Sequence, residues 1–452
     1  MLITDLNRHG GIGSNCHLVE IGPFRLVIDA GIHPKMVGMD GVPEFKKIPD
    51  YSVDAVILTH CHLDHLGAIP LVMRHQPEAR LLMSVPSSII ATRMLHNSVN
   101  VMMRQRDEHG ITEFPLYTHS EIERMAHQIQ PMPYEKTRYL DKGTEELAIT
   151  FYPSGHVPGA VGVELVYNHR SIFFTGDVLF EDQKYLPGAS FPRKEFDTLV
   201  METTRGRQSR AKDSSRQHEL DRLFKTIGKT LTNSGSVLIP VFALGRMQEL
   251  VCLMHEARRL GHIPKDCPIY ASGLGLDLAD YFDEITRKTG SLNFRKGVLK
   301  DLKVKRMPDM LPGKDPQENA IYLVSSGMLV ANTPSYAACA SLLDHSRNTV
   351  CFVGYCDPDT PGGELQATGH GDAFLFEKLD YICNINASIE RFDLSAHADR
   401  EELLNFALEV SPRSIILTHG DDDARQWFME QLTELLPKAK VQNLTPLEAT
   451  EI

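Results

Sequence analysis

The chain has 452 residues, which at about 150 residues per domain predicts two or three domains. Hydrophobic residues make up 42% and charged residues 23%, so intrinsic disorder, a collagen-like fibre and a disulfide-stapled miniprotein are excluded. The 47 basic and 59 acidic residues give a net charge of −12. That charge argues only weakly against a nucleic-acid partner, because local charge decides such binding. The longest nearly apolar stretch, 236–244, contains a proline and is too short to span a membrane.

The cysteines indicate the cellular compartment, and the histidines indicate candidate functional residues. The eight cysteines are scattered and show no C-x-x-C spacing, which predicts buried free thiols, a reducing compartment and a cytoplasmic location. The N-terminal sequence contains Asp5 and lacks an apolar core, so we expect no signal peptide. The twenty histidines are an unusual number, and only those that cluster are treated as candidate functional residues.

The first two hundred residues alternate short β-type runs with breaks at glycine. The predicted strands are 16–20, 24–28, 54–58, 80–84, 147–152, 161–166, 171–175 and 198–201. A polar stretch at 96–130 carries Met, Ile and Leu at helical spacing, which predicts helices that decorate the sheet.

The middle of the chain alternates helical patterns with buried strand-like runs. Helices are predicted at 214–232, 244–260, 276–289 and 336–343, and strands at 236–241, 268–272, 320–326 and 348–355. Such alternation predicts a parallel α/β sheet that forms a domain of its own.

The sequence pattern of the C-terminal part resembles that of the first two hundred residues. Two strands each end at a histidine, His397 and His419, and helices follow at 400–410 and up to about 436. Because loops after neighbouring strands can meet, both histidines are expected to reach one cleft. We therefore expect 1–206 and 384–452 to form one discontinuous domain, with 207–383 inserted into it.

The stretch THCHLDHLG at 59–67 is the most informative part of the sequence. It follows the apolar run AVIL, so it lies in a loop just after a strand. His60 and His62 are two residues apart and can reach one ion together, whereas Asp64 and His65 continue round the turn and can reach a second. Imidazole and carboxylate ligands suit Zn²⁺, so a zinc site is expected here.

Two ions need further ligands, and three other strand ends offer them. SGHVPG places His156 after an apolar strand, FFTGDV places Asp177 likewise, and LTHGD supplies His419. Asp177 has two carboxylate oxygens and could bridge ions about 3.5–4 Å apart. Asp29, at the end of the run RLVID, is expected to orient a ligand rather than to bind metal.

The order H-x-H-x-D-H, followed by an isolated His, Asp and His, resembles the metallo-β-lactamase superfamily. This resemblance implies a four-layer αββα sandwich that holds two Zn²⁺ per chain at one edge. Under it, the ligands of the first zinc are His60, His62 and His156. The ligands of the second are Asp64, His65 and His419, and Asp177 bridges the two ions. Spacing alone does not divide the ligands between the ions.

Further segments narrow the resemblance to the β-CASP nucleases, which include the eukaryotic pre-mRNA 3′-end cleavage endonuclease and its bacterial and archaeal relatives. VMETTRG resembles the family's E-S-T-Y-G, VFALGRMQELV resembles A-x-G-R-x-Q-E, and DLSAHAD resembles F-S-A-H-x-D. VSSGML and FVGYCDPDTPGGEL resemble two more family motifs. The resemblance covers residues 11–420 and implies a metallo-β-lactamase sandwich with an inserted parallel α/β β-CASP domain.

Some positions depart from the family pattern. Arg205 stands where the family usually has Tyr, and TPGGEL replaces the commoner T-L-G-R-x-L, which removes a basic residue that could face RNA. These departures bear on the substrate and not on the metal ligands. Since the chain also lacks the extra modules of several relatives, a minimal two-domain nuclease is expected.

The resemblance also implies a chemistry. The expected reaction is hydrolysis of RNA phosphodiester bonds by a hydroxide held between two zinc ions, leaving 5′-phosphate and 3′-hydroxyl ends. Asp64 is expected to orient the hydroxide as well as to bind metal. His397 is expected to protonate the leaving oxygen, with Glu202 fixing its tautomer and raising its pKa. The expected partner is single-stranded RNA, with no membrane, and a homodimer is left open.

Two basic runs in the inserted region could follow an RNA backbone, although each could equally be a solvated face. The first contains Arg205, Arg207, Arg210, Lys212 and Arg216. The second contains Arg295, Lys296, Lys300, Lys303, Lys305 and Arg306. Arg246 precedes a helix and could bind phosphate or brace the domain. Ser326 and Gly327 could donate to phosphate at a strand end.

Three other functions remain as alternatives. A small-molecule hydrolase of the lactonase or thioesterase type is disfavoured, because such enzymes need neither an inserted domain nor the pair Glu202 and His397. A non-catalytic RNA-processing scaffold is disfavoured because all seven candidate ligands are present. A DNA-directed nuclease is disfavoured because that branch typically lacks the last histidine, here His419. The sequence leaves open whether cleavage is internal or from one end.

Overall fold

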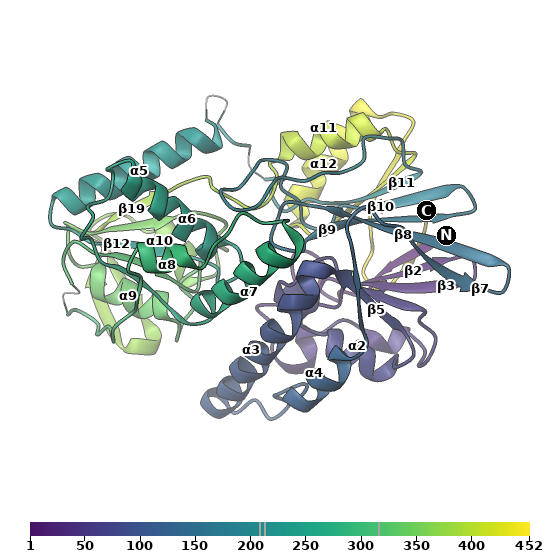
Figure 1. The fold of residues 1–452 in the computed structure, drawn as a ribbon, viewed down its shortest axis with the longest axis horizontal. Helices are drawn as coiled ribbons and strands as arrows, with labels where there is room; N and C mark the ends of the chain where they lie inside the picture. The colour runs from purple at the N-terminus through teal and green to yellow at the C-terminus, as the bar shows by residue number, and fades with distance from the viewer. Residues whose placement is uncertain (208, 212–213, 315–316) are drawn as a thin grey trace. The chain divides into compact units, whose positions relative to one another are not determined.

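The structure, a computed structural model, describes residues 1–207, 209–211, 214–314 and 317–452 (Figure 1). The chain divides into two compact units. Unit 1 comprises Met1–Asp182, Pro187–Ser209 and His397–Ile452. Unit 2 comprises Gln183–Leu186 and Arg210–Ala396.

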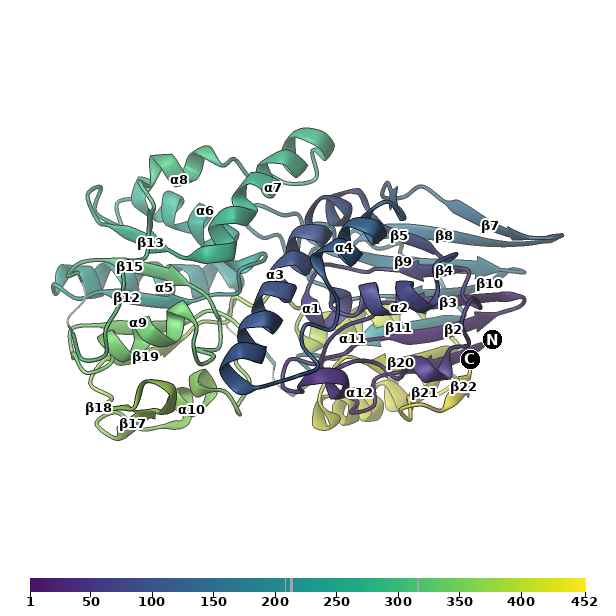
Figure 2. The ribbon, with the colours of Figure 1, turned by 90° about the horizontal axis from the view of Figure 1, so that it is seen from below.

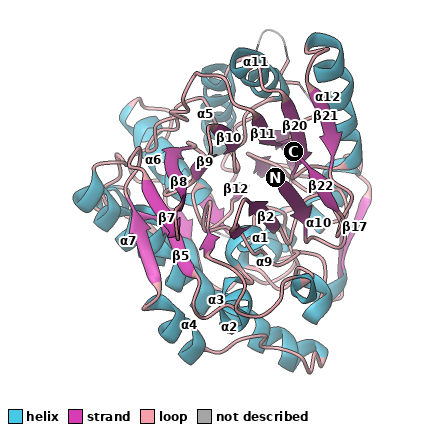
Figure 3. Cartoon of the chain, turned by 90° about the vertical axis from the view of Figure 1, so that its right-hand side faces the viewer, coloured by secondary structure: helices cyan, strands magenta, loops and turns pink. Residues whose placement is uncertain are grey.

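Unit 1 contains two mixed sheets of seven strands each. The first sheet has the order β22 (Ala449–Glu451), β1 (Leu2–Asp5), β2 (His17–Ile21), β3 (Phe24–Ile28), β4 (Ala55–Ile57), β5 (Arg80–Ser84) and β6 (Ile129–Met132). The second has the order β21 (Lys440–Asn443), β20 (Ser414–Thr418), β11 (Thr198–Glu202), β10 (Arg170–Phe174), β9 (Val161–Tyr167), β8 (Glu145–Pro153) and β7 (Arg138–Lys142). Strand β22 pairs with β1, so the two ends of the chain lie side by side in the first sheet (Figure 3).

The helices of unit 1 flank these sheets (Figure 2). Those of the N-terminal part are α1 (Leu63–Leu66), α2 (Ile69–His75), α3 (Val85–His109) and α4 (His119–Ala126), with short 3₁₀ turns η1 (Gly38–Gly41) and η2 (Phe45–Lys47). Those of the C-terminal part are α11 (Arg400–Val410) and α12 (Asp422–Leu435). The predicted helical stretch at 96–130 is thus two helices, and the first begins earlier, at Val85, where the Ser84 hydroxyl caps it.

Apolar side chains hold the layers of unit 1 together. Val19 and Leu26 of the first sheet pack with Ile149 and Val163 of the second in one buried cluster. On its other face the second sheet packs against α11 and α12, which contribute apolar side chains such as Phe406 to a separate cluster. Strand residues alternate between the two faces, which is why each strand can serve both clusters. This is the expected αββα arrangement.

Unit 2 is built on a six-stranded sheet in which all pairs are parallel. Its order is β14 (Lys305–Arg306), β13 (Ile269–Ala271), β15 (Ile321–Val324), β12 (Val237–Pro240), β16 (Thr349–Phe352) and β19 (Ser388–Arg391). Helices α5 (Arg216–Thr232) and α6 (Arg246–Arg259) pack on one face and α9 (Pro334–Leu342) and α10 (Pro361–Ala367) on the other. The remaining elements are α7 (Gly273–Thr289), α8 (Gly297–Asp301), η3 (Glu377–Leu379) and the hairpin β17 (Ala373–Phe376) and β18 (Tyr381–Asn384).

The structure differs from the expected domain division at the second crossing. The segment 384–396 was assigned to the first domain, but β19 pairs with β16 and extends the sheet of unit 2. The chain therefore returns to unit 1 only at His397. The sequence does not reveal this domain boundary, because the residues of a strand do not indicate which sheet the strand joins.

The structure bears on two predictions from the sequence, that no segment spans a membrane and that the cysteines are free thiols. Every helix in the described ranges falls short of the length or the apolar character that crossing a bilayer requires. All eight cysteines are free, and six of them are buried.

Candidate metal centre

The candidate ligands lie in loops that directly follow strands of unit 1. After β4 the chain turns through His60 and His62 into α1, and this turn also carries Asp64 and His65. His156 follows β8, Asp177 follows β10 and His419 follows β20. The ligands thus come from the ends of strands in both sheets, which brings residues over 350 positions apart into contact.

The first group of ligands contains His60, His62, His156 and Asp177. Nδ1 of His62 lies 3.2 Å from Nε2 of His60 and 3.1 Å from Nε2 of His156. Oδ2 of Asp177 lies 3.6 Å from Nε2 of His60 and 3.7 Å from Nε2 of His156. These four ligand atoms therefore surround one point.

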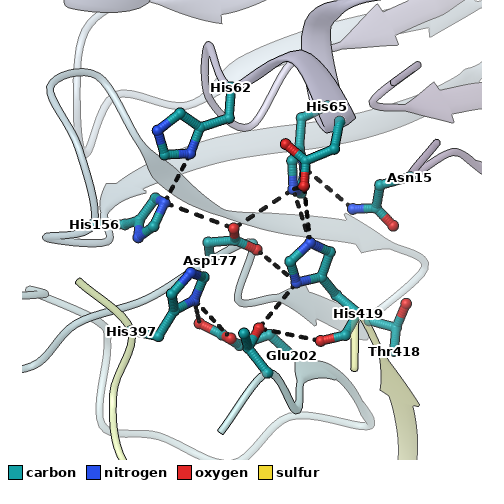
Figure 4. Close-up of polar contacts among 12 residues, drawn as sticks. Asn15, His62, His65, His156, Asp177, Glu202, His397, Thr418 and His419 are labelled. Atoms are coloured by element: carbon teal, nitrogen blue, oxygen red, sulfur yellow. Dashed lines mark hydrogen bonds and ion pairs between the residues drawn. The ribbon is translucent and has the colours of Figure 1, made fainter. Parts of the chain in front are cut away.

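The second group contains Asp64, His65 and His419. Nε2 of His419 lies 3.3 Å from Nε2 of His65 and 3.3 Å from Oδ2 of Asp64. Oδ2 of Asp177, already part of the first group, lies 3.5 Å from Nε2 of His65. Figure 4 shows the Asp177 carboxylate between the two groups, so one carboxylate contacts both.

The residues fit metal ions. Oδ1 of Asp177 is buried, forms no hydrogen bond among the described residues and lies 3.3 Å from Nδ1 of His419, so a positive charge compensates it only when that ring is protonated or a cation binds. Nδ1 of His62 lies within 3.2 Å of two other ring nitrogens, and Nε2 of His419 lies 3.3 Å from that of His65, so a cation between these nitrogens could accept several lone pairs at once. Imidazole nitrogens with a few carboxylate oxygens form the donor set that Zn²⁺ prefers.

The candidate ligands shift one another's pKa values. Burial lowers the pKa of His60 well below its ordinary value, and the neighbouring His65 lowers it further. Burial also acts to lower the pKa of His65, but the carboxylates of Asp177 and Asp64 outweigh it and raise that pKa well above its ordinary value. Burial acts to raise the pKa of Asp64, yet His65 and His419 hold it well below its ordinary range. The charge on each of these side chains therefore depends on that of its neighbours.

Asp29 lies behind His65, where the sequence predicts an orienting residue. Its Oδ2 accepts a hydrogen bond from Nδ1 of His65 at 2.8 Å, and its Oδ1 accepts one from the Thr59 backbone N–H at 2.7 Å. A donated proton on Nδ1 leaves the Nε2 lone pair of His65 directed toward the ligand group. Asn15 also contacts Nδ1 of His65, at 3.1 Å.

Two threonines that the sequence analysis did not single out hold two further ligands. The Thr59 hydroxyl donates to Asp29 at 2.7 Å and lies 3.2 Å from Nδ1 of His60. The Thr204 hydroxyl donates to the His419 carbonyl at 3.2 Å and lies 3.0 Å from Nδ1 of His419. A hydroxyl has one hydrogen, so each donates to its oxygen and accepts from the ring N–H. The signal in the sequence is only that each threonine adjoins a motif residue.

Glu202 and His397 meet beside the ligand groups. Nδ1 of His397 lies 3.0 Å from Oε2 of Glu202, and the carboxylate also accepts a hydrogen bond from the Val178 backbone N–H at 2.7 Å. Burial acts to lower the pKa of His397, but the Glu202 charge and hydrogen bond outweigh it and raise the pKa. The His397 ring lies 4.5 Å from the ring of His156, between centroids. The pair thus adjoins the candidate metal ligands.

The residues that were expected to contact the substrate, Arg246, Ser326 and Gly327, make contacts within the protein. Arg246 is buried, and its guanidinium donates to the Leu394 carbonyl at 2.7 Å and pairs with Glu249. Those contacts favour the bracing role over phosphate binding. The Ser326 hydroxyl accepts a hydrogen bond from the Val330 backbone N–H at 2.9 Å. A Cβ on Gly327 would lie 2.9 Å from the Phe242 ring, so its backbone is closely packed.

The two arginines expected to touch RNA are both ion-paired. Arg207 pairs with Asp423 at 2.7 Å, and Arg210 pairs with Asp393 at 3.4 Å. These pairs weaken the expectation that their charges are available to a phosphate backbone. Lys212, in the same run, lies outside the described residues.

Comparison with known proteins divides the chain in a similar way, although the last matched segment begins inside unit 2. Residues 9–214 match the model of the metallo-β-lactamase superfamily, residues 247–365 match the β-CASP domain, and residues 383–442 match the RNA specificity domain of zinc-dependent metallo-hydrolases. Together these models cover most of the chain and confirm the expected fold class.

Individual relatives are distant but extensive. The endoribonuclease YSH1 of Eremothecium gossypii is 27% identical over 97% of this chain, which spans only 56% of that protein. The RNase J-like protein of Methanocaldococcus jannaschii is 27% identical over 92% of both chains. A solved structure, that of a protein of unknown function from Enterococcus faecalis V583, covers 99% of both chains with a TM-score of 0.57 at 15% identity, and it supports the fold alone.

The matched families, the two sheets with their inserted parallel unit, and the convergent histidines and aspartates agree with one another. The chain belongs to the metallo-β-lactamase superfamily and, within it, to the β-CASP family of zinc-dependent, RNA-specific metallo-hydrolases.

Proposed function

We propose that this chain is a ribonuclease that hydrolyses the phosphodiester bonds of single-stranded RNA with two zinc ions, leaving 5′-phosphate and 3′-hydroxyl ends. The observation that carries the proposal is the position of the Glu202 and His397 pair directly beside the seven candidate ligands. A metal site alone suits many hydrolases, whereas a buried carboxylate that holds a histidine next to it supplies a proton for a poor leaving group. The free cysteines are compatible with a reducing compartment such as the cytoplasm.

We assign the ligands to the two ions as the two groups divide them. His60, His62 and His156 would hold one zinc, and Asp64, His65 and His419 would hold the other, with Asp177 contacting both. When bound, the zinc ions supply positive charge at the phosphate and activate water for attack at neutral pH.

The chain's own residues supply the remaining steps. Asp64 is 23% exposed, whereas every other ligand of the two groups except His62 is buried, so one of its oxygens can orient the attacking water. Water passes a proton to the solvent and forms the new bond to phosphorus, and the bond from phosphorus to the 3′-oxygen breaks. His397 gives its proton to that oxygen, while Glu202 holds its other ring nitrogen and stabilises the protonated ring. Only a protonated 3′-oxygen leaves readily at neutral pH.

The test uses zinc-loaded protein and end-labelled single-stranded RNA that carries either a 5′-phosphate or a 5′-hydroxyl. Internal cuts would indicate an endonuclease, and a ladder from one end would indicate an exonuclease. Product ends that a kinase labels only after phosphatase treatment would carry the expected 5′-phosphate. The double variant His62→Ala, Asp177→Ala is the control for contaminating ribonuclease. If single-stranded DNA of the same sequence, a lactone or a thioester is turned over while RNA survives, the proposal is wrong.

A further inference from the structure

The structure distinguishes the two basic runs, which look equivalent in the sequence. In the first run, Arg207 and Arg210 pair with aspartates, and Arg216 is buried against Glu249 at 2.5 Å. Arg216 also donates to the Ser395 carbonyl at 3.1 Å. Among the described residues of this run, these charges are used to fix the chain itself.

The second run is arranged in the opposite way. Four exposed cations lie in and beside helix α8 and strand β14, and we call them the basic strip: Arg295, Lys300, Lys303 and Lys305. None of these four side chains forms an ion pair or hydrogen bond with any residue in the described ranges. Their charges therefore remain available to an external partner.

Apolar contacts fix the segment that carries the strip. Leu302 is buried in the core cluster, and Val298, Leu299 and Val304 pack against that cluster. The Arg258 guanidinium donates to the Leu302 carbonyl at 2.9 Å, which ties α6 to the end of α8. Figure 2 shows α8 close to α6 and α7 within unit 2. The inward side chains are thus apolar and the outward ones are mostly cations, with Asp301, which lies 4.0 Å from Nε2 of His255, as the exposed anion of α8.

Charge pairing reappears at the margins of the strip. Lys296 pairs with Asp280, and Arg306 lies 3.9 Å from Asp277. Unpaired cations are therefore gathered on a short segment of a chain whose net charge is −12. Lys300 and Lys305 are at most about 18 Å apart along an extended chain, which is the reach of a few nucleotides.

We propose that the basic strip binds the phosphate backbone of the RNA substrate. Exposed lysines act as point charges for phosphates, whereas protein interfaces favour aromatic residues and are depleted in lysine. The strip exposes no aromatic side chain for base stacking, because Phe294 is buried. Its contacts would therefore be electrostatic and independent of sequence. This inference rests on the proposed ribonuclease function.

The test neutralises the strip in the triple variant Lys300→Gln, Lys303→Gln, Lys305→Gln. Binding of a single-stranded RNA is measured at several salt concentrations with the zinc-loaded full chain carrying His397→Ala, so that cleavage is slow. The slope of log affinity against log salt should fall by about 2, at about 0.7 for each lost phosphate contact on a single strand. Affinity at low salt should fall several-fold.

The matched control is the triple variant Lys184→Gln, Arg287→Gln, Lys288→Gln. It removes the same three charges from unit 2, but each of those side chains is paired with an acidic neighbour. The control should keep the parental slope, and both triple variants should hydrolyse a bis-nitrophenyl phosphodiester at the parental rate. Equal loss in both triple variants, or no loss in either, would overturn the proposal, and no loss in either would leave an acidic protein as the remaining class of partner. A parent that neither binds nor cuts RNA would instead overturn the proposed function.

Discussion

Two buried clusters of charged side chains, one in each unit, are balanced in different ways. In unit 2, Glu249 lies between Arg216 and Arg246, and the arginines also donate to backbone carbonyls of the described chain. In unit 1 the partners of the buried Asp177 carboxylate are histidine nitrogens, which are charged only when protonated: its Oδ1 lies 3.3 Å from Nδ1 of His419 and its Oδ2 lies 3.5 Å from Nε2 of His65. A cluster that balances itself supports the fold, whereas one that does not balance itself requires a ligand.

The largest expected effect comes from removing metal ligands from the cluster of unit 1, which we call the unbalanced cluster. The double variant His62→Ala, Asp177→Ala loses a ligand of the first group and the carboxylate that contacts both. We expect it to lose most of its zinc and nearly all hydrolysis, because neither ion keeps a complete set of ligands. Elemental analysis of protein purified without chelator should approach two zinc ions per parent chain. Full metal content in the double variant would contradict the ligand assignment.

The next largest effect separates metal binding from proton donation. His397→Ala should keep its zinc and still bind RNA, yet cleave it about 10²–10⁴-fold more slowly, the usual contribution of a positioned general acid. Glu202→Gln should lose less. The control is a bis-nitrophenyl phosphodiester, whose leaving group needs no proton, so His397→Ala should hydrolyse it nearly as well as the parent. Equal losses on both substrates, or loss of zinc, would mean that His397 shapes the metal site.

The sequence revealed the unbalanced cluster far better than the balanced one. His60, His62, Asp64 and His65 stand within six residues, and ligand chemistry restricts which residue types can serve, so their pattern is visible without a structure. A basic residue such as Arg246 has no such restriction. Whether it reaches solvent or a buried carboxylate depends on tertiary packing, which the local sequence does not encode.

The balanced cluster, that of unit 2, can be disrupted by replacing its central residue, Glu249. Glu249→Gln would leave Arg216 and Arg246 buried side by side without their anion. Because removing one partner leaves an uncompensated buried charge, we expect unfolding to require about 3–5 kcal/mol less free energy. Chemical denaturation measures the change, and zinc content should stay at the parental level.

A surface pair provides the matched control for that variant. Arg207→Gln breaks the ion pair with Asp423, both partners of which are about half exposed, and should cost about 1 kcal/mol or less. If Glu249→Gln instead lost zinc at unchanged stability, the two clusters would be coupled and the comparison between them would fail.

The smallest expected effect concerns the hydrogen bond that orients the His419 ring for metal binding. The Thr204 hydroxyl donates to the His419 carbonyl, so only its lone pairs face Nδ1 of that ring, at 3.0 Å. This arrangement requires a proton on Nδ1 and directs the Nε2 lone pair toward Asp64 and His65. Thr204→Val removes the hydroxyl at nearly constant shape and should weaken zinc binding about 10–100-fold, as loss of an orienting partner does.

Competition with a coloured chelator measures that change without relying on activity. Thr204→Ser retains the hydroxyl and should restore most of the affinity, which distinguishes the hydrogen bond from the packing of the threonine methyl group. If the serine and valine variants bind zinc equally weakly, Thr204 acts by fixing the loop after β11 and not the ring of His419. If both bind as the parent does, the tautomer of His419 is set by the metal itself, and the cluster needs no preparation before the ion arrives.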